Sequence, residues 1–88
     1  LIRSGTKIAT LVIPRKGSID IQGENRIEII QRLVDVHNAG PMPMMTENLV
    51  KGIAEHQSLS NIFKQDLWNK LKADFLRSPQ KGRWEIAI

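Results

Sequence analysis

Two short runs near the N-terminus, residues 8–13 and 18–22, repeat with a period of two, and the first is rich in β-branched side chains. This pattern is typical of strands with one buried face. Pro14 fixes the entry of a turn between them, and Gly17 can adopt positive φ at its exit. The pattern therefore predicts a β-hairpin over residues 1–22. Because a two-stranded ribbon is marginal alone, its apolar face should rest on the helices that follow.

After Gly23 the apolar period changes to about 3.6 residues, which indicates a helix from residue 24 or 25 to 38. Acidic residues come early, where the helix dipole favours them. Residues 38–40 (Asn-Ala-Gly) form a stop signal. The two prolines of residues 41–45 forbid continuation and make that segment extended, as a bridging strand whose methionines fill gaps in the core. The apolar stripe of this helix consists of Ile27, Ile30, Leu33, Val34 and His37, widened by Ile29 and Val36.

Two further helices are predicted from the remaining periodic segments. Thr46 is a good N-cap for a second helix over residues 47–55. Ser60 is expected to cap a third helix over residues 61–77, which Pro79 stops. One broad face of the third helix is apolar and consists of Phe63, Leu67, Trp68, Leu71 and Phe75.

Gly82 turns the chain into a final alternating strand over residues 84–88. With the hairpin and the helices, this strand predicts an α+β fold built as a single domain over residues 1–88, since 88 residues are too few for two cores. The residues expected to form one buried cluster are Ile30, Leu33, Val34, Leu49, Ile53, Leu67, Leu71 and Trp84.

Composition narrows the class of protein. Hydrophobic residues make up 41% and charged residues 25%, which is ordinary for a globular chain. The absence of cysteine excludes disulfides and thiolate metal sites, and it fits a reducing compartment, so a cytoplasmic location is expected. No apolar run approaches the roughly 18–20 residues that span a bilayer, so no membrane partner is expected. The chain begins at Leu1 rather than Met, which suggests a domain cut from a longer protein.

The net charge of +4 is unevenly distributed along the chain. Residues 1–19 carry +4, residues 20–58 carry −3, and residues 59–88 carry +3. Two basic ends around an acidic middle predict one basic face if the ends meet in the fold, and such a face attracts nucleic acid. A generally solvated surface with an excess of lysine accounts for the charge equally well.

The element order after residue 24 is helix, extended stretch, short helix, turn, longer helix, basic turn and strand. This order resembles that of the winged helix-turn-helix superfamily over roughly residues 24–88, with the hairpin as an extension. The resemblance implies a three-helix winged-helix-like core whose third helix enters the major groove of double-stranded DNA. The usual wing is strand-turn-strand, whereas here the helix pattern runs almost to Pro79. Either residues 75–78 form the first wing strand, or the final strand pairs with the hairpin.

The resemblance also indicates which residues would contact DNA. Asparagine and glutamine can read base edges, whereas lysine and arginine bind phosphates. We expect the helix over residues 61–77 to meet the major groove and the turn over residues 79–83 to meet the backbone. The candidate nucleic-acid-binding residues are Asn61, Lys64, Gln65, Asn69, Lys70, Lys72, Arg77, Lys81 and Arg83, together with Arg15 and Lys16 of the hairpin turn.

No residue pattern indicates catalysis, a metal or a cofactor. His37 and His56 are the only histidines, without the spacing of a metal site, and His37 lies on an apolar stripe. Glu24 and Glu28 are explained by the helix dipole. Trp68 and Trp84 could stack on bases but occupy inward positions. The fragment is therefore not expected to be an enzyme, although its parent protein could be one.

A second function is compatible with the same fold. Winged helices also serve as protein-interaction or dimerisation modules of larger enzymes and assemblies, because fold does not fix function. The hairpin could supply an edge for a partner protein or pair with itself in a homodimer. A DNA-binding role would instead place the protein at the nucleoid.

Overall fold

The computed structural model describes residues 1–5, 7–40, 42–54 and 57–87, and it has an α+β fold. The helices are α1 (Glu24–Ala39), α2 (Thr46–Val50), α3 (Leu59–Phe63), α4 (Gln65–Lys70) and the π-helical segment η1 (Leu71–Phe75). One antiparallel sheet holds β1 (Ile2–Arg3), β2 (Ile8–Ile13) and β3 (Gly17–Gln22). The other holds β4 (Met44–Met45), β5 (Leu76–Arg77) and β6 (Arg83–Ile86).

The predicted N-terminal hairpin is confirmed. Strands β2 and β3 pair from Ile8 opposite Gln22 to Ile13 opposite Gly17, around a tight basic turn. The sequence did not predict β1, which pairs Ile2 with Thr10 along the other edge of β2. The β2 side chains that point inward, Ala9, Leu11 and Ile13, are at most 2% exposed, so the hairpin is part of the main core.

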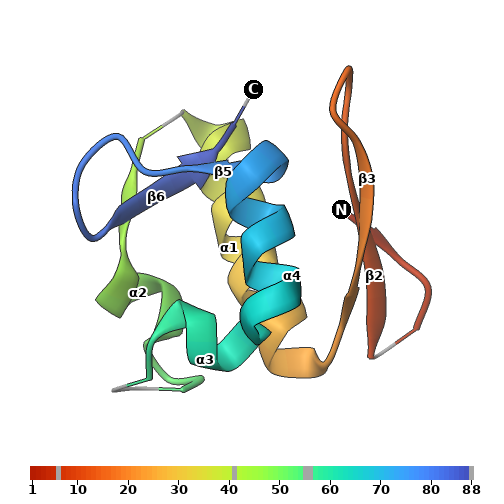
Figure 1. Ribbon diagram of the computed structural model, residues 1–88, viewed down its shortest axis with the longest axis horizontal. Helices are drawn as coiled ribbons and strands as arrows, with labels where there is room; N and C mark the ends of the chain where they lie inside the picture. The colour runs from red at the N-terminus through yellow and green to blue at the C-terminus, as the bar shows by residue number, and fades with distance from the viewer. Residues whose placement is uncertain (6, 41, 55–56, 88) are drawn as a thin grey trace.

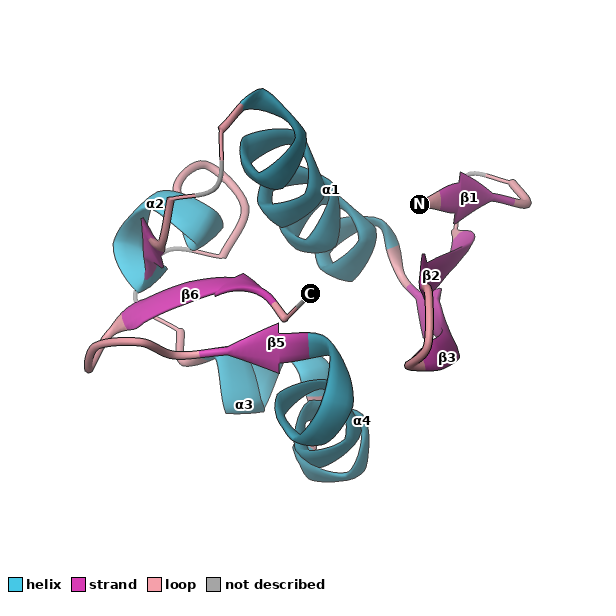
Figure 2. Ribbon diagram, turned by 90° about the horizontal axis from the view of Figure 1, so that it is seen from above, coloured by secondary structure: helices cyan, strands magenta, loops and turns pink. Residues whose placement is uncertain are grey.

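Helix α1 is the centre of the molecule. It contacts β2 and β3 on one side and β6, α2 and α3 on others. Figure 1 shows the β2–β3 hairpin on the right, the β5–β6 strands on the left, and α1 and α4 between them. Seen from above, the hairpin lies on the side of α1 and α4 that is away from β5 and β6 (Figure 2). The buried residues of both sheets and of the helices form one cluster.

The C-terminal sheet has the strand order β4–β6–β5. Strand β5 follows η1 directly and pairs Leu76 with Ile86. The sequence left open whether residues 75–78 form a strand or the final strand pairs with the hairpin. The first arrangement is correct for residues 76–77, and β6 does not pair with the hairpin. The bridging strand β4 is also confirmed, and it pairs Met44 with Trp84.

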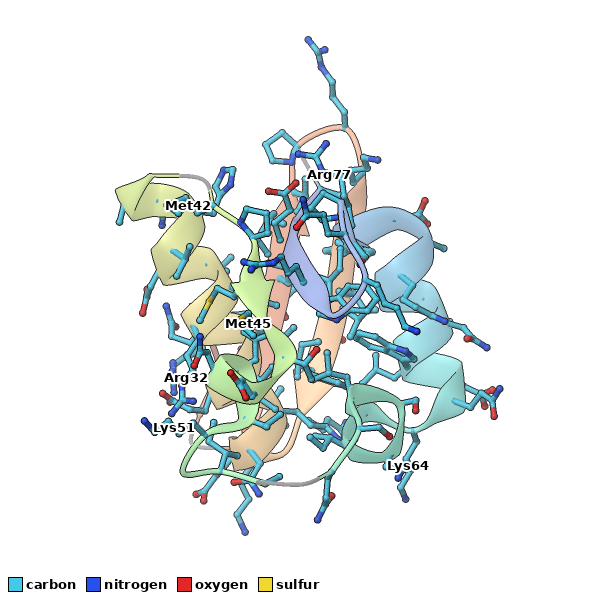
Figure 3. The ribbon with its side chains drawn as sticks, turned by 90° about the vertical axis from the view of Figure 1, so that its left-hand side faces the viewer. Arg32, Met42, Met45, Lys51, Lys64 and Arg77 are labelled. Atoms are coloured by element: carbon cyan, nitrogen blue, oxygen red, sulfur yellow. The ribbon has the colours of Figure 1, made fainter. Side chains whose placement is uncertain are left out.

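The methionines before α2 fill the core less than expected. Met42 is 69% exposed and Met45 is 39% exposed, whereas Met44 packs against the core. Met45 faces solvent because successive side chains of β4 alternate between its two faces, whereas Met42 precedes the strand. Figure 3 shows Met42 and Met45 on the face of the molecule opposite the hairpin.

The predicted third helix over residues 61–77 is wrong in its bounds. Ser58, not Ser60, caps its start, since the Asn61 backbone N–H donates to Ser58 Oγ at 3.2 Å. Lys64 has φ of 64° and separates α3 from α4, and the helix ends at Phe75. The break lets both Phe63 and Trp68 be buried, and their rings stack at 5.8 Å.

A second hydrogen bond stabilises this break. Arg26 Nε donates to the carbonyl oxygen of Ile62, at the end of α3, at 2.8 Å. A helix terminus needs such partners because its last carbonyls have no intrahelical donor. Arg26 therefore joins the start of α1 to the end of α3.

The second helix is shorter than the predicted residues 47–55, of which Glu55 lies outside the described residues. Thr46 is its first residue rather than its cap, and the Thr46 hydroxyl donates to Gly82 O at 3.2 Å. One nitrogen of Arg32 donates to three carbonyls at the end of α2, those of Asn48, Leu49 and Lys51, at 3.1, 3.1 and 2.8 Å. The helix ends where Lys51, with ψ of 124°, leaves the helical conformation, and Arg32 gives the terminal carbonyls a partner.

Half of the eight predicted core residues are fully buried. Ile30, Leu33, Leu49 and Leu71 are at most 2% exposed, whereas Val34, Ile53, Leu67 and Trp84 are half-buried and pack against the cluster. Trp68, at 6% exposed, occupies the interior more completely than Trp84.

The conformation of Lys64 leads to a stability prediction. Its φ of 64° with ψ of 157° is a glycine-like backbone conformation, and such strain costs about 1–3 kcal/mol in other residues. Lys64→Gly should therefore raise the free energy of unfolding by about 1 kcal/mol, since glycine's own entropic cost offsets part of the relief. Lys70→Gly is the matched control, because Lys70 has ordinary helical angles. This variant should lower the free energy of unfolding by about 1 kcal/mol. Urea unfolding measures both, and an equal loss at both positions would contradict the strain.

Candidate nucleic-acid interface

Helix α4 and its π-helical continuation η1 present a polar outer face. Gln65, Asn69 and Lys72 are exposed on successive turns, whereas Trp68 and Leu71 point into the core. The division follows the apolar period of the sequence, because residues three and four apart share one face of a helix. The outer face therefore offers two amides and a cation, with Asp66 and Asp74 exposed beside them. The predicted polar face is confirmed as exposed.

An aromatic cluster holds this helix in place. Trp68 stacks on Phe63 and meets Trp84 edge to face, with ring centroids 4.9 Å apart. Lys72 Nζ lies 5.8 Å from the centre of the Trp68 ring, within the range of a cation–π interaction. Trp68 is therefore a core residue, as the sequence suggested, and one of the exposed cations is positioned by contact with it. Trp84 is half-buried and links the helix to β6.

The loop between β5 and β6, which we call the wing turn (residues 78–82), is fixed by local hydrogen bonds. Ser78 Oγ donates to Gln80 O at 2.7 Å, and Arg83 N donates to the same oxygen at 3.0 Å. Gly82 closes the turn at φ of 78°, a conformation that other residues rarely adopt. Lys81 is exposed at the turn, whereas Arg83 lies in β6 and is half-buried.

Arg77 of β5 and Glu85 of β6 form an ion pair across the two strands. Arg77 Nε donates to Glu85 Oε1 at 2.7 Å, and the two residues are direct neighbours in the β5–β6 register. The Glu85 side chain is 15% exposed and that of Arg77 is 56% exposed. One guanidinium edge is therefore held against the sheet, while most of the arginine stays accessible.

The structure brings some of the predicted residues together and separates others. Lys16, Lys72 and Arg77 line one hollow between the hairpin turn, η1 and the C-terminal strands. Asn61 and Lys64 line a different hollow at the far end of α4. The remaining candidates, Gln65, Asn69, Lys70, Lys81 and Arg15, are exposed outside the first hollow, and Arg83 is half-buried.

Sequence reasoning missed the neighbours of Lys64. Lys7 and Arg26 line the same hollow of about 740 Å³, although Lys7 is far from Lys64 along the chain and Arg26 belongs to α1. It also missed the acidic residues near α4, since Asp20 of β3 comes to lie near Asp66 and Asp74. These proximities cannot be predicted from the spacing of residues in the sequence, because they depend on how the hairpin packs against the helices.

Other kinds of site receive no support from the described residues. Within residues 1–5, 7–40, 42–54 and 57–87 there is no group of three His, Asp or Glu side chains that could hold a metal ion. His37 is half-buried on α1, and His56 lies outside the described residues. In the same part of the chain, no helix has the length and apolarity required to span a bilayer.

Comparisons with known proteins assign no function: no protein-family model, no curated protein and no solved structure matches this chain. The geometry of the exposed face is therefore the basis for the functional inference.

Proposed function

We propose that this chain is a DNA-binding module of the winged helix-turn-helix class, acting at the nucleoid in the cytoplasm. The observation that supports it is the path of the chain from α4 to the wing. The polar helix α4–η1 leads directly into β5, the wing turn and β6, in a sheet of order β4–β6–β5. In this proposal α4–η1 enters the major groove, and the wing turn contacts the adjacent backbone (Figures 1 and 2).

The side chains on this face have the chemistry that duplex recognition needs. Amide groups such as those of Gln65 and Asn69 can pair bidentately with adenine. Cations such as Lys72 and Lys81 bind phosphates without regard to sequence. The arginines at the centre of the fold have other roles, since Arg26 and Arg32 donate to backbone carbonyls. The proposed interface therefore does not include Arg26 or Arg32.

The wing provides the test of this proposal. The double variant Lys81→Ala/Arg83→Ala should bind every duplex more weakly than the parent, because both cations would contact phosphates. The slope of log affinity against log salt should become shallower by up to about two units. Fluorescence anisotropy with several mixed-sequence duplexes, each over a range of NaCl concentrations, measures both quantities.

Lys51→Ala is the control for loss of charge, because Lys51 lies beside Arg32 and away from the wing (Figure 3). Thermal unfolding of the double variant must be recorded, since Arg83 is half-buried. If the folded double variant binds as the parent does at every salt concentration, the wing does not contact DNA. If the parent binds no duplex even at low salt, the proposed function is wrong.

A specific observation favours a second candidate, an interaction or dimerisation module. The outer face of the N-terminal sheet exposes three aliphatic side chains: Ile2 is 60%, Ile8 46% and Val12 49% exposed. Ile2 lies opposite Thr10, and residues paired across antiparallel strands share a face, so the three form one surface. A second copy or a partner protein could cover it. Sedimentation that depends on concentration, together with no DNA binding, would favour this candidate over the first.

A further inference from the structure

Three cations from distant parts of the chain line a single hollow. Lys16 comes from the hairpin turn, Lys72 from η1 and Arg77 from β5, and the hollow between them has a volume of about 510 Å³. Figure 3 shows Arg77 at the same end of the molecule as the hairpin turn. The other described residues that line the hollow are uncharged: Ala73, Leu76, Ser78, Trp84 and Ala87.

Of these three cations, Arg77 alone forms an ion pair with a described residue. Neither Lys16 nor Lys72 forms such a pair with a described residue, and Lys72 Nζ lies 5.8 Å from the centre of the Trp68 ring. Glu85 holds Arg77 through Nε and so leaves the terminal nitrogens of the guanidinium for another acceptor. Like charges placed together repel one another. A bound anion would offset the repulsion among the cations that line this hollow.

A neighbouring hollow has the opposite charge balance. Between β3 and the α4–η1 helix, about 760 Å³ of space is lined by Asp20, Asp66 and Asp74 against Lys16 and Lys70. An anion near the hairpin turn is therefore repelled from the β3 side and attracted to the side of Lys72 and Arg77. Lys16 lines both hollows, so it stands at the boundary between an acidic and a basic surface.

We propose that Lys16, Lys72 and Arg77 form a phosphate-binding site that the N-terminal hairpin completes, and that its ligand is a phosphodiester group of the nucleic-acid backbone. This assignment rests on the proposed function and extends it. The hairpin is then part of the DNA-binding surface, because its turn contacts the backbone beside the groove that α4–η1 occupies. Arginine and lysine are suited to this ligand, one as a planar fork and the other as a point charge.

The first experiment compares two lysines of the hairpin. Lys16→Ala should raise the Kd for a mixed-sequence duplex about threefold to tenfold at physiological salt and make the salt slope shallower by about one unit. Lys7→Ala removes the same charge at the other end of the hairpin, outside the hollow, and should leave the Kd within about twofold of the parent value. Both side chains are exposed, and circular dichroism confirms that each variant is folded.

A double variant tests whether the cations share one phosphate. Lys16→Ala/Lys72→Ala should weaken binding by less than the product of the two single effects, because the second substitution acts on a contact that the first has already weakened. Effects that multiply exactly would show that the two lysines bind separate phosphates, which contradicts a common site.

The second experiment does not depend on DNA. Inorganic phosphate is titrated into the protein while the lysine side chains are followed by NMR. The Lys16 and Lys72 signals should move together and saturate, while those of Lys7 and Lys51 stay unchanged. If all four lysines respond alike, the hollow is not a phosphate site.

The two experiments separate the two claims. A parent protein that binds duplexes, with Lys16→Ala and Lys7→Ala behaving alike, would overturn the site and leave the proposed function standing. Saturable phosphate shifts at Lys16 and Lys72 in a protein that binds no duplex would support the site, overturn the proposed function, and assign the site to free phosphate.

Discussion

Replacing Trp68 with alanine is expected to lower the free energy of unfolding by about 3–5 kcal/mol, the usual cost of removing a large buried aromatic side chain. Trp68 is 6% exposed, stacks on Phe63 and meets Trp84 at a centroid distance of 4.9 Å. Aromatic pairs contribute about 0.5–1.5 kcal/mol each beyond the area they bury. Because a small domain has only about 5–15 kcal/mol of stability in total, this single change should leave the protein marginally folded.

Trp68→Phe is the matched control, since it keeps a ring between Phe63 and Trp84 and should lose clearly less stability than the alanine variant. Chemical unfolding followed by circular dichroism measures both. Equal losses in the two variants would show that ring contact at this position is unimportant. A loss below about 1 kcal/mol for alanine would contradict the burial of Trp68 itself.

Leu71→Ala is the second change with a large expected effect, a loss of about 2–5 kcal/mol. Leu71 is 0% exposed and is the first residue of the π-helical segment η1. Removing its side chain leaves a cavity beneath the helix that carries the proposed interface. The loss should appear in urea unfolding as a lower midpoint with an unchanged slope, which is the signature of changed stability alone.

Leu67→Ala distinguishes core packing from helix propensity in this experiment. Leu67 belongs to the same helix but is only half-buried, so its loss should be smaller although the chemical change is identical. If Leu71→Ala costs less than half a kcal/mol, η1 does not pack as described.

The elements with a clear sequence period were predicted well. The hairpin and α1 were found within a residue or two of their ends, because Gly17, Gly23 and Gly40 all take positive φ at element boundaries. The same glycines are visible in the sequence as stop and turn signals. The α+β class followed from these elements, since each has one apolar face that must be covered by another.

The interior of the C-terminal half could not be predicted in this way. A continuous apolar stripe from Phe63 to Phe75 indicates one straight helix, but tertiary packing broke it at Lys64, where a lysine adopts a conformation typical of glycine. The carbonyls at the end of α2 are bound by Arg32, which lies in a different helix. Local propensity contains neither effect, because both come from contacts between distant segments.

The candidate site was predicted in its parts and not in its arrangement. The sequence indicated that Lys16, Lys72 and Arg77 were exposed cations, as most lysines and arginines are. The charge pattern suggested one basic face if the two basic ends meet, but it did not show which cations would be neighbours, because the place of Lys16 depends on how the hairpin packs alongside η1. It likewise did not reveal that Asp20, Asp66 and Asp74 gather next to Lys70.

The C-terminal end of the wing turn is hydrogen-bonded to the start of α2. The carbonyl of Gly82 accepts hydrogen bonds from both the backbone N–H and the hydroxyl of Thr46, at 2.9 and 3.2 Å, and Arg83 continues into β6 opposite Met45. Lys81, the residue before Gly82, is exposed, and no described residue holds its backbone in this way. Arg83 and Lys81 therefore differ in preorganisation: the backbone of Arg83 is fixed in β6 before any ligand binds, whereas the exposed Lys81 would lose rotational freedom on binding. A ligand contact through Arg83 would therefore cost less conformational entropy. Lys81 would cost more, but its side chain could adjust its position to the ligand.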